Sequence, residues 1–351
     1  MPSLVFLARI AGLVLAAQPS FRAPELVGGW RTSGPVLYQV NAVSTTPADD
    51  PVVYAAASIY SASESALFRS ADGGKTWNTL VEAQGEFYSE ILVDPRQSQR
   101  VYAGAHGSAP TASIYRSANA GQTWALAHSV SPSCSPSFAP GSTPDTVLSA
   151  CGLKVLRSQD GGASWTELPT PFSVPMRLTP GASGSVLAYG ASSIFRTTND
   201  GGSWAAIASA PPGCPTLLAL DVDPTDGNVL VSGTGMLGGS GFLCGGVFRS
   251  ADGGKTWGDN ALPDFYVTDV VIDPTSPSSV FAGASFLTGI LPRGGVFQSH
   301  DGGGTWENLR VPASGAVRLA LSPSGRRIHA ATPVGVYDRG FRRTSTVLPR
   351  E

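Results

Sequence analysis

The chain has 351 residues, a length that fits two ordinary domains or one large all-β domain. Charged residues make up only 14% of it, whereas 42 glycines and 28 prolines supply turn formers, so many short strands are favoured over long helices. The net charge of −2 and the pI of about 6.1 give no electrostatic case for binding nucleic acid or an anionic membrane.

The first element in chain order is an apolar stretch from Leu4 to Ala17, interrupted by Arg9 and ended by small residues. It is too short to span a membrane and has the layout of an export signal. We therefore expect a signal peptide at residues 1–22, a folded domain at 23–343 and a tail at 344–351. The alternative for the first segment is a frayed tail. With a signal peptide, the mature protein is secreted or periplasmic.

A motif of the form Ser-x-Asp-x-Gly-x-Thr-Trp then recurs six times, at intervals of about 40–50 residues. The segments 68–77 and 248–257 both read FRSADGGKTW. In each copy the Asp position of the motif holds Asp or Asn, five residues before the Trp. The pairs are Asp72 and Trp77, Asn119 and Trp124, Asp160 and Trp165, Asn199 and Trp204, Asp252 and Trp257, and Asp301 and Trp306. A period of this length indicates repeated supersecondary units, propeller blades among them.

The segments between the motifs are periodic too. An apolar run ends in Asp-Pro at residues 94–95, 223–224 and 273–274, and a second run such as RVYAGA or SVFAGA follows. A third run enters the motif, and its Trp opens a fourth. Four short strands joined by turns form one blade of a β-propeller.

On these residues the motif resembles the Asp-box, or BNR, repeat. That repeat occurs in sialidases, the sortilin ectodomain, xyloglucan-cleaving glycosidases and photosystem II assembly factors. The resemblance implies a propeller, but not one activity, because these families differ in chemistry. It also implies that the boxes lie on the face opposite the ligand site.

A seventh blade follows from the two ends of the chain. After Trp306 come three apolar runs, AVRLALSP, RIHAAT and GVYDRG, with no Trp behind them, and the only remaining Trp is Trp30. A strand at Trp30 would complete this last blade and remove the open edges of the ring. We predict an all-β fold: a seven-bladed β-propeller of four-stranded antiparallel blades, closed by an N-terminal strand.

The motif itself is interpreted as structural. Asp72 can accept hydrogen bonds from turn amides, the glycines allow positive φ, and Trp77 offers a large apolar ring for burial between sheets. Six similar copies around a ring cannot all be sites, because a catalytic site is single and asymmetric.

The four cysteines fall into two local pairs, Cys134 with Cys151 and Cys214 with Cys244. Three connectivities are open to four cysteines, and free buried thiols are a further alternative. Local disulfides are favoured if each pair lies in one structural unit, and they agree with export. Neither pair has the spacing of zinc ligands, so we expect no metal, and no motif predicts a cofactor.

A candidate site comes from aligning the first strands on their terminal proline. Five residues before Pro95, Pro274 and Pro323 stand Glu90, Asp269 and Arg318. Aromatic pairs precede two of them, and from these pairs we take Tyr88, Phe265 and Tyr266 as apolar walls. Long loops between the second and third strands occur in the first, second, fifth and sixth blades. The alternatives are an ordinary polar pore mouth and tolerated insertions.

We interpret the chain as a ligand-binding or protein-interaction scaffold without a recognisable catalytic constellation. Its partner would be a glycan or a protein, and we expect a monomer. The alternative is a glycoside hydrolase, xyloglucanase-like or sialidase-like, with Glu90 and Asp269 as catalytic candidates. Such a pair must lie roughly 5–9.5 Å apart. The Arg-Ile-Pro motif of sialidases is missing from the sequence.

Overall fold

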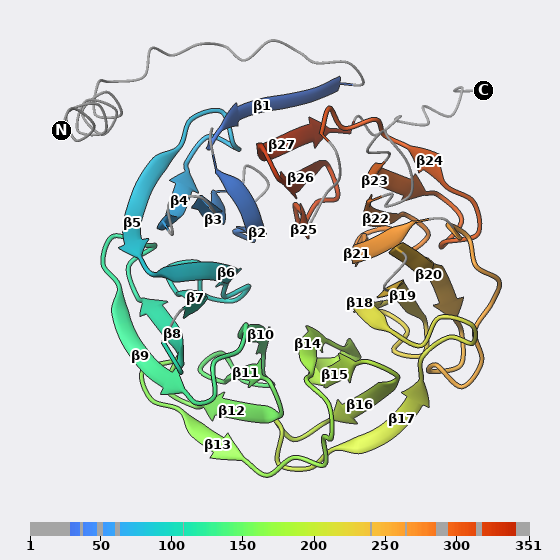
Figure 1. Cartoon of the computed structure of the whole chain (residues 1–351), viewed down its shortest axis with the longest axis horizontal. Coiled ribbons are helices and arrows are strands. Elements are labelled where there is room, and N and C mark those ends of the chain that lie inside the picture. Colours follow the sequence, from blue (N-terminus) through green and yellow to red (C-terminus); the bar gives the residue numbers. More distant parts are fainter. Residues whose placement is uncertain are drawn as a thin grey trace, which may run out of the picture.

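In a computed structural model the chain forms a closed ring of seven antiparallel sheets (Figure 1). The structure describes residues 29–35, 38–47, 52–59, 64–107, 109–238, 241–263, 265–285, 294–313 and 318–341. The segments predicted as signal peptide and as tail, 1–22 and 344–351, lie outside these residues.

Each sheet is one blade, and in the first six blades the strands follow in sequence order from the centre of the ring outward. The first three blades consist of β2 (Gln39–Thr45), β3 (Val53–Ile59), β4 (Glu64–Ser70) and β5 (Asn78–Gln84); β6 (Glu86–Val93), β7 (Val101–Gly107), β8 (Ala112–Ser117) and β9 (Ala125–Val130); and β10 (Ser137–Pro140), β11 (Val147–Cys151), β12 (Lys154–Ser158) and β13 (Thr166–Leu168).

The next three blades consist of β14 (Arg177–Pro180), β15 (Val186–Gly190), β16 (Ser193–Thr197) and β17 (Ala205–Ser209), with a short 3-10 turn at Ala182–Gly184; β18 (Leu217–Val222), β19 (Leu230–Gly238) and β20 (Gly241–Ser250); and β21 (Tyr266–Ile272), β22 (Val280–Ser285), β23 (Gly294–Ser299) and β24 (Glu307–Asn308). The seventh blade consists of β25 (Arg318–Leu321), β26 (Arg327–Thr332), β27 (Gly335–Gly340) and β1 (Trp30–Gly34).

The N-terminal strand closes the ring, as predicted. β1 pairs antiparallel with β27, and Trp30 stands opposite Arg339. The Trp30 indole N–H donates to the carbonyl of Leu309 in the sixth blade at 2.7 Å, so this residue joins the sixth and seventh blades. The N-terminal strand and the last three strands thus share one sheet, so the ring closes within the seventh blade.

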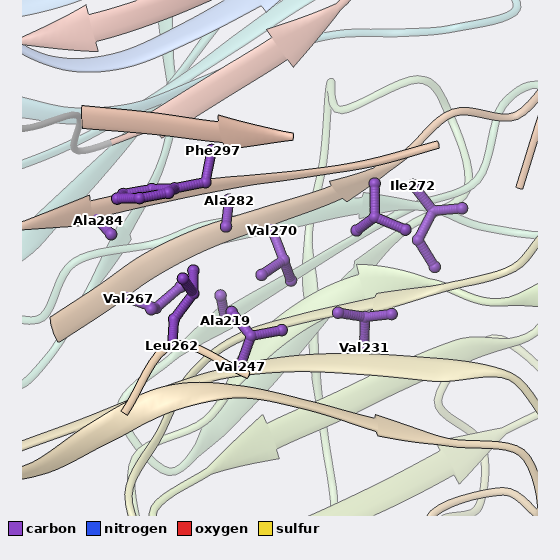
Figure 2. Packing of buried hydrophobic residues seen from close by; sticks show 11 residues of the cluster. Ala219, Val231, Val247, Leu262, Val267, Val270, Ile272, Ala282, Ala284 and Phe297 are labelled. Carbon is purple, nitrogen blue, oxygen red and sulfur yellow. The ribbon is translucent and has the colours of Figure 1, made fainter. Parts of the chain in front are cut away.

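Seven apolar clusters hold the ring together, one between each pair of neighbouring blades. Figure 2 shows the cluster between the fifth and sixth blades, where Val270 and Ile272 of β21 face Val231 and Val247. Each cluster contains one of the seven tryptophans: Trp77, Trp124, Trp165, Trp204, Trp257, Trp306 and Trp30 in ring order. Successive side chains of a strand point to opposite faces, so each blade packs one face against each of its two neighbours.

Burial of the tryptophans differs from the expectation. Trp30 is fully buried, but the six motif tryptophans are half-buried at the outer edge of their clusters. The reason is their place at the start of the outermost strand, where solvent reaches one side of the ring. Their contribution to stability is therefore smaller than that of a fully buried indole.

The repeat motif folds into a tight loop between the third and fourth strands. In the first copy the Asp72 carboxylate accepts the backbone N–H groups of Lys75 and Thr76 and the hydroxyl of Thr76, at 2.7–3.0 Å. Gly73 and Gly74 have φ of 72° and 92°, where a side chain would be strained. Asn119 keeps the same acceptor role through Oδ1, so the motif serves as a turn in all copies.

The fifth blade departs from the predicted four strands, because its sheet has three. After Trp257 the chain runs through Gly258, Asp259 and Asn260, residue types that strands disfavour. This segment still follows β20, through the Gly258 N–H to the Arg249 carbonyl at 2.8 Å and the Ala261 N–H to the Val247 carbonyl at 3.0 Å.

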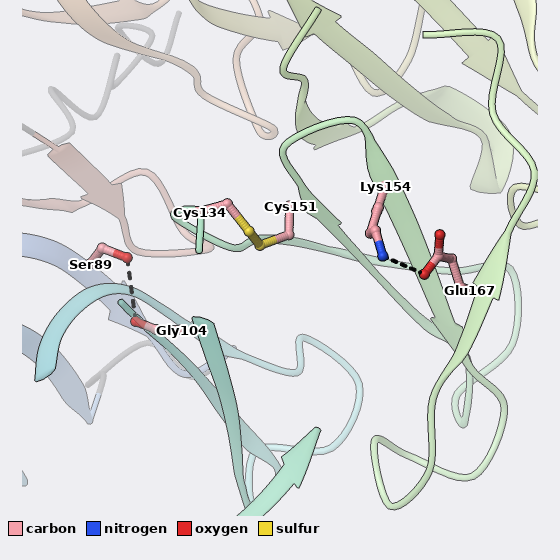
Figure 3. The surroundings of a disulfide bond; sticks show 6 residues. All are labelled: Ser89, Gly104, Cys134, Cys151, Lys154 and Glu167. Carbon is pink, nitrogen blue, oxygen red and sulfur yellow. Dashed lines mark hydrogen bonds and ion pairs between the residues drawn. A yellow bond between two sulfur atoms is a disulfide. The ribbon is translucent and has the colours of Figure 1, made fainter. Parts of the chain in front are cut away.

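Both predicted disulfides are present. Cys134 and Cys151 are joined in the third blade, with 5.4 Å between their Cα atoms (Figure 3). Cys214 and Cys244 are joined in the fifth blade, with a Cα separation of 5.6 Å. Each bond fixes the segment that leads into an innermost strand to a neighbouring strand of the same blade.

Candidate functional site

The innermost strands of the seven blades surround the centre of the ring (Figure 1). The space that they enclose is called the central channel, and they all run in the same direction along it, because every blade is antiparallel and begins at its innermost strand. Strands alternate in direction within a blade, so the motif loops, between the third and fourth strands, lie at the end where the innermost strands finish. Arg177 and Arg318 are the first residues of β14 and β25. They therefore lie toward the opposite end, which is the face predicted for a ligand.

A cavity of about 220 Å³ occupies the channel. Six of the seven innermost strands contribute polar residues to its wall: Glu90 from β6, Ser137 from β10, Arg177 and Thr179 from β14, Asp221 from β18, Asp269 from β21 and Arg318 from β25. The structure thus brings together the three polar residues selected from the sequence, Glu90, Asp269 and Arg318.

The sequence reasoning missed other lining residues, among them Arg177, Asp221 and Tyr189. The proline alignment did not select Arg177, because β14 ends in Thr-Pro rather than Asp-Pro and its proline lies three residues after Arg177 instead of five. The dipeptide Arg-Leu opens both β14 and β25 and could have revealed it. Asp221 stands three residues before Pro224 in an otherwise apolar strand, which was a usable signal.

Glu90 and Arg177 form an ion pair across the channel, with 3.0 Å between Oε2 and Nη2. The two side chains are 18% and 36% exposed, so the pair is partly solvated inside the cavity. Arg318 donates from Nη1 to the Thr268 carbonyl at 2.7 Å, which directs this guanidinium toward the sixth blade.

The two aspartates link neighbouring blades. Asp269 accepts the Leu319 N–H of the seventh blade at 2.6 Å, and Asp221 accepts the Ile272 N–H of the sixth blade at 2.7 Å. Ser137 serves the same purpose for the Leu178 N–H. These bonds satisfy donors that face the next blade, since innermost strands do not pair with each other.

Burial changes the acid strength of both carboxyl groups. It raises the pKa of Asp269 to about 6, although Arg318, the Leu319 N–H and Arg177 act in the opposite direction. Burial raises the pKa of Asp221 to about 7, against the backbone N–H groups that it accepts. Carboxyl groups with raised pKa values in one cavity are a feature of functional sites.

A β-bulge explains why the predicted aromatic wall does not face the cavity. In β6 the register shifts between Tyr88 and Glu90, which pair with the consecutive residues Ala105 and Gly104. Consecutive residues point to opposite faces, so Glu90 reaches the channel while Tyr88 is buried, 2% exposed, between the first and second blades. Tyr88 is therefore a core residue.

The other two predicted wall residues also lie outside the cavity lining. Phe265 packs edge-on against Phe297, with 4.7 Å between ring centroids, beside the cluster of the fifth and sixth blades. The Tyr266 ring lies against the backbone of Gly235 in β19. The long loops predicted on this face lie partly at 60–63, 108, 239–240 and 286–293, outside the described residues.

A second groove, of about 690 Å³, lies on the outer rim between β17 and the motif loop of the fifth blade. Gly254 of this loop lies against Ala208, whereas Gly121 and Gly201, the corresponding glycines of two other loops, lie against Leu80 and Leu168. The Trp257 indole crosses the space and donates to the Ser209 carbonyl at 2.9 Å. Ala206, Ala208 and Ala210 form part of the groove wall.

Two features are missing from the described part of the chain. No set of three or more His, Cys, Asp or Glu groups lies close enough together there to hold a metal ion. The same residues include no helix with the length and apolar character that crossing a membrane requires.

No protein-family model matches the chain, and no curated protein matches it. Solved structures do. YCF48 bound to a D1 peptide has a TM-score of 0.64 at 17% identity, over 91% of this chain and 99% of the other. An ancestral GH74 enzyme has a TM-score of 0.67 at 17% identity, over 90% of this chain but only 46% of the enzyme.

A chain of the mitotic checkpoint complex has a TM-score of 0.64 at 14% identity, over 93% of this chain and 96% of the other. The chain studied here spans less than half the length of the ancestral GH74 enzyme. At these identities the likeness concerns the fold and carries no activity across. Together with the seven sheets, it identifies the fold as a seven-bladed β-propeller.

Proposed function

We propose that the chain is an exported Asp-box β-propeller that acts as a protein-interaction scaffold and binds its partner at the mouth of the central channel. One observation carries this proposal: six blades contribute polar residues to the wall of a single cavity. A site assembled from the ends of different elements is what a rigid ring offers a ligand.

The size of the cavity favours a protein partner over a free small molecule. Small-molecule pockets usually measure about 300–1,000 Å³, whereas this cavity measures about 220 Å³. It has room for one side chain of a partner whose remaining surface rests on the surrounding loops. Peptide recognition by the similarly folded YCF48 is compatible with this mode.

Export is supported by the cysteines. Disulfides persist in oxidising compartments, and all four cysteines of the chain are paired. The apolar N-terminal segment fits the same location. The proposed compartment is therefore extracellular or periplasmic.

A randomised peptide library displayed on phage and selected against the purified ring tests the proposed function. We expect enriched peptides, with affinities that Glu90→Gln and Asp269→Asn weaken by roughly 0.5–3 kcal/mol each, the value of a hydrogen bond. Asp72→Asn is the matched control, because it makes the same chemical change at the opposite end of the ring. A library that yields no specific peptide would argue against a peptide-binding scaffold.

Glycoside hydrolysis is the second candidate. It is favoured by the raised pKa values of Asp221 and Asp269, since a general acid must hold its proton near neutral pH. Against it, each carboxylate already accepts a backbone N–H of the next blade. Incubation with xyloglucan and with sialosides, followed by assay of released reducing ends and free sialic acid, decides the matter. Turnover abolished by Asp269→Asn would support the enzyme.

A further inference from the structure

The charges around the channel cavity do not balance. Its wall carries three carboxyl groups, Glu90, Asp221 and Asp269, and two guanidinium groups, Arg177 and Arg318. The ion pair between Glu90 and Arg177 occupies one of each. Arg318 lies beside Asp269, where it is the strongest influence favouring the charged carboxylate. One carboxyl group, that of Asp221, is left without a cation.

Asp221 has no basic partner within ion-pair distance among the described residues. Its two oxygens accept the N–H groups of Val222, at 2.9 Å, and Ile272, at 2.7 Å. A carboxylate has about four acceptor positions, so about two remain toward the cavity. Buried charged groups are normally paired or fully hydrogen-bonded, and the Asp221 carboxyl group lines the cavity.

The volume of the cavity limits the size of the group that it could bind. At about 30 Å³ for each water of the liquid, 220 Å³ corresponds to about seven non-hydrogen atoms. A lysine or arginine side chain has about this number. Because a metal ion needs several ligands that converge, and the described residues contain no such set, an organic cation fits better.

We propose that the channel binds the cationic side chain of a lysine or arginine from a protein partner, with Asp221 as its counter-ion and the Glu90–Arg177 pair beside it. This inference rests on the proposed scaffold function and deepens it by naming the recognised group. The resulting specificity is for basic rather than neutral or acidic residues, because only a cation completes the charge balance of the wall.

Proton linkage gives this binding a signature. Burial, together with Asp269 and Asp223, raises the pKa of Asp221 to about 7. The charged groups that face it are Asp223 on its own blade, Arg177 on β14, Glu90 on β6, Asp269 on β21 and Arg318 on β25. A cation binds the ionised form, so affinity rises with pH. For a pKa of about 7 the increase between pH 6 and pH 8 is about tenfold.

Three capped tripeptides test the proposal by calorimetric titration into the purified full chain: acetyl-Gly-Lys-Gly-amide, and the same peptide with Gln or with Glu in the centre. We expect the Lys peptide to bind, about tenfold more tightly at pH 8 than at pH 6. The Gln and Glu peptides should bind at least tenfold more weakly than the Lys peptide at pH 8.

Two variants change the affinity in opposite directions. Asp221→Asn should weaken the Lys peptide by roughly 10- to 100-fold, the value of a hydrogen bond to a charged group, and flatten its pH dependence. Arg177→Met removes a like charge and releases Glu90, so the Lys peptide should bind more tightly. This second variant keeps the test decisive if Asp221→Asn does not fold. Glu82→Gln, an exposed change on β5, is the control and should have no effect.

The outcomes separate this inference from the scaffold function. If the peptide selection enriches sequences without a basic residue, or if the Glu peptide binds more tightly than the Lys peptide, the inference is wrong while the scaffold function stands. If the selection enriches nothing and the Lys peptide does not bind, both are wrong. Lys binding that Asp221→Asn and Arg177→Met leave unchanged would also overturn the inference.

Discussion

Glu90 and Arg177 meet across the channel at 3.0 Å although their strands, β6 and β14, belong to blades that are not neighbours. The blade between them contributes Ser137, whose short side chain leaves the space open. The pair therefore ties the second blade to the fourth directly.

The first prediction concerns this pair. In a double-mutant cycle with Glu90→Gln and Arg177→Met, we expect a coupling free energy of about 0.5–1.5 kcal/mol. The value is modest because both side chains are partly exposed to water in the cavity. Urea unfolding of the four proteins measures it. A coupling near zero would mean that the pair does not form in solution.

The second prediction concerns closure of the ring. Trp30→Ala should lower the free energy of unfolding by about 3–5 kcal/mol, because a fully buried indole is lost. Trp30→Phe should cost less, since it keeps much of the packing and loses the bond to Leu309. Trp257→Ala is the comparison, because this half-buried tryptophan should cost less than Trp30. Equal effects at both positions would contradict the closure by β1.

The third prediction concerns the repeat motif. Asp72→Ala should cost on the order of 1 kcal/mol, because the turn loses its acceptor. Asp72→Asn should cost less, since Asn119 and Asn199 already make the same turn. Both variants should leave peptide affinity unchanged, as measured by titration at a temperature where the protein is folded. A loss of affinity without a loss of melting temperature would place the motif in the site.

Most of the fold was predictable because it repeats. Six copies of one motif fixed the number of complete blades, and Trp30 was the single tryptophan left to close the seventh. The cysteine pairs were also predictable, since each lay inside one blade. The three-stranded fifth blade was not, because the loss of a strand depends on the few residues after Trp257 and not on the repeat.

The site was predictable only in part. Aligning strands on their terminal proline found Glu90, Asp269 and Arg318, because the register of an innermost strand fixes which residues reach the channel. It failed for Tyr88, because a bulge between Tyr88 and Glu90 turns them to opposite faces. Such an inserted residue has no local mark in the sequence.

The fourth prediction concerns acid stability. His329 is fully buried in the seventh blade, and its two ring nitrogens have no hydrogen-bond partner among the described residues. Burial lowers its pKa to about 3. In the unfolded chain the pKa of this imidazole is near 6.5, so on acidification the unfolded chain binds a proton at His329 that the folded ring does not bind. Stability is present above pH 6.5 and is lost as pH falls toward 3, by about 2 kcal/mol between pH 7 and pH 5.

His329→Leu isolates this effect from the carboxyl groups of the channel. The difference in unfolding free energy between the natural protein and the variant should shift by about 2 kcal/mol in favour of the variant on going from pH 7 to pH 5. Urea unfolding at both pH values measures it. A difference that stays constant with pH would show that the imidazole is protonated, or hydrated, in the folded ring.

The central claim is that the channel, and not the rim, binds the partner. The most direct test is a crystal structure of the purified chain with the tightest peptide from the library selection. Our account predicts one peptide side chain inside the cavity, between Glu90, Asp221 and Arg318, with the rest of the peptide on the face where the innermost strands begin. A peptide bound in the groove beside Trp257, with the channel unchanged, would contradict it.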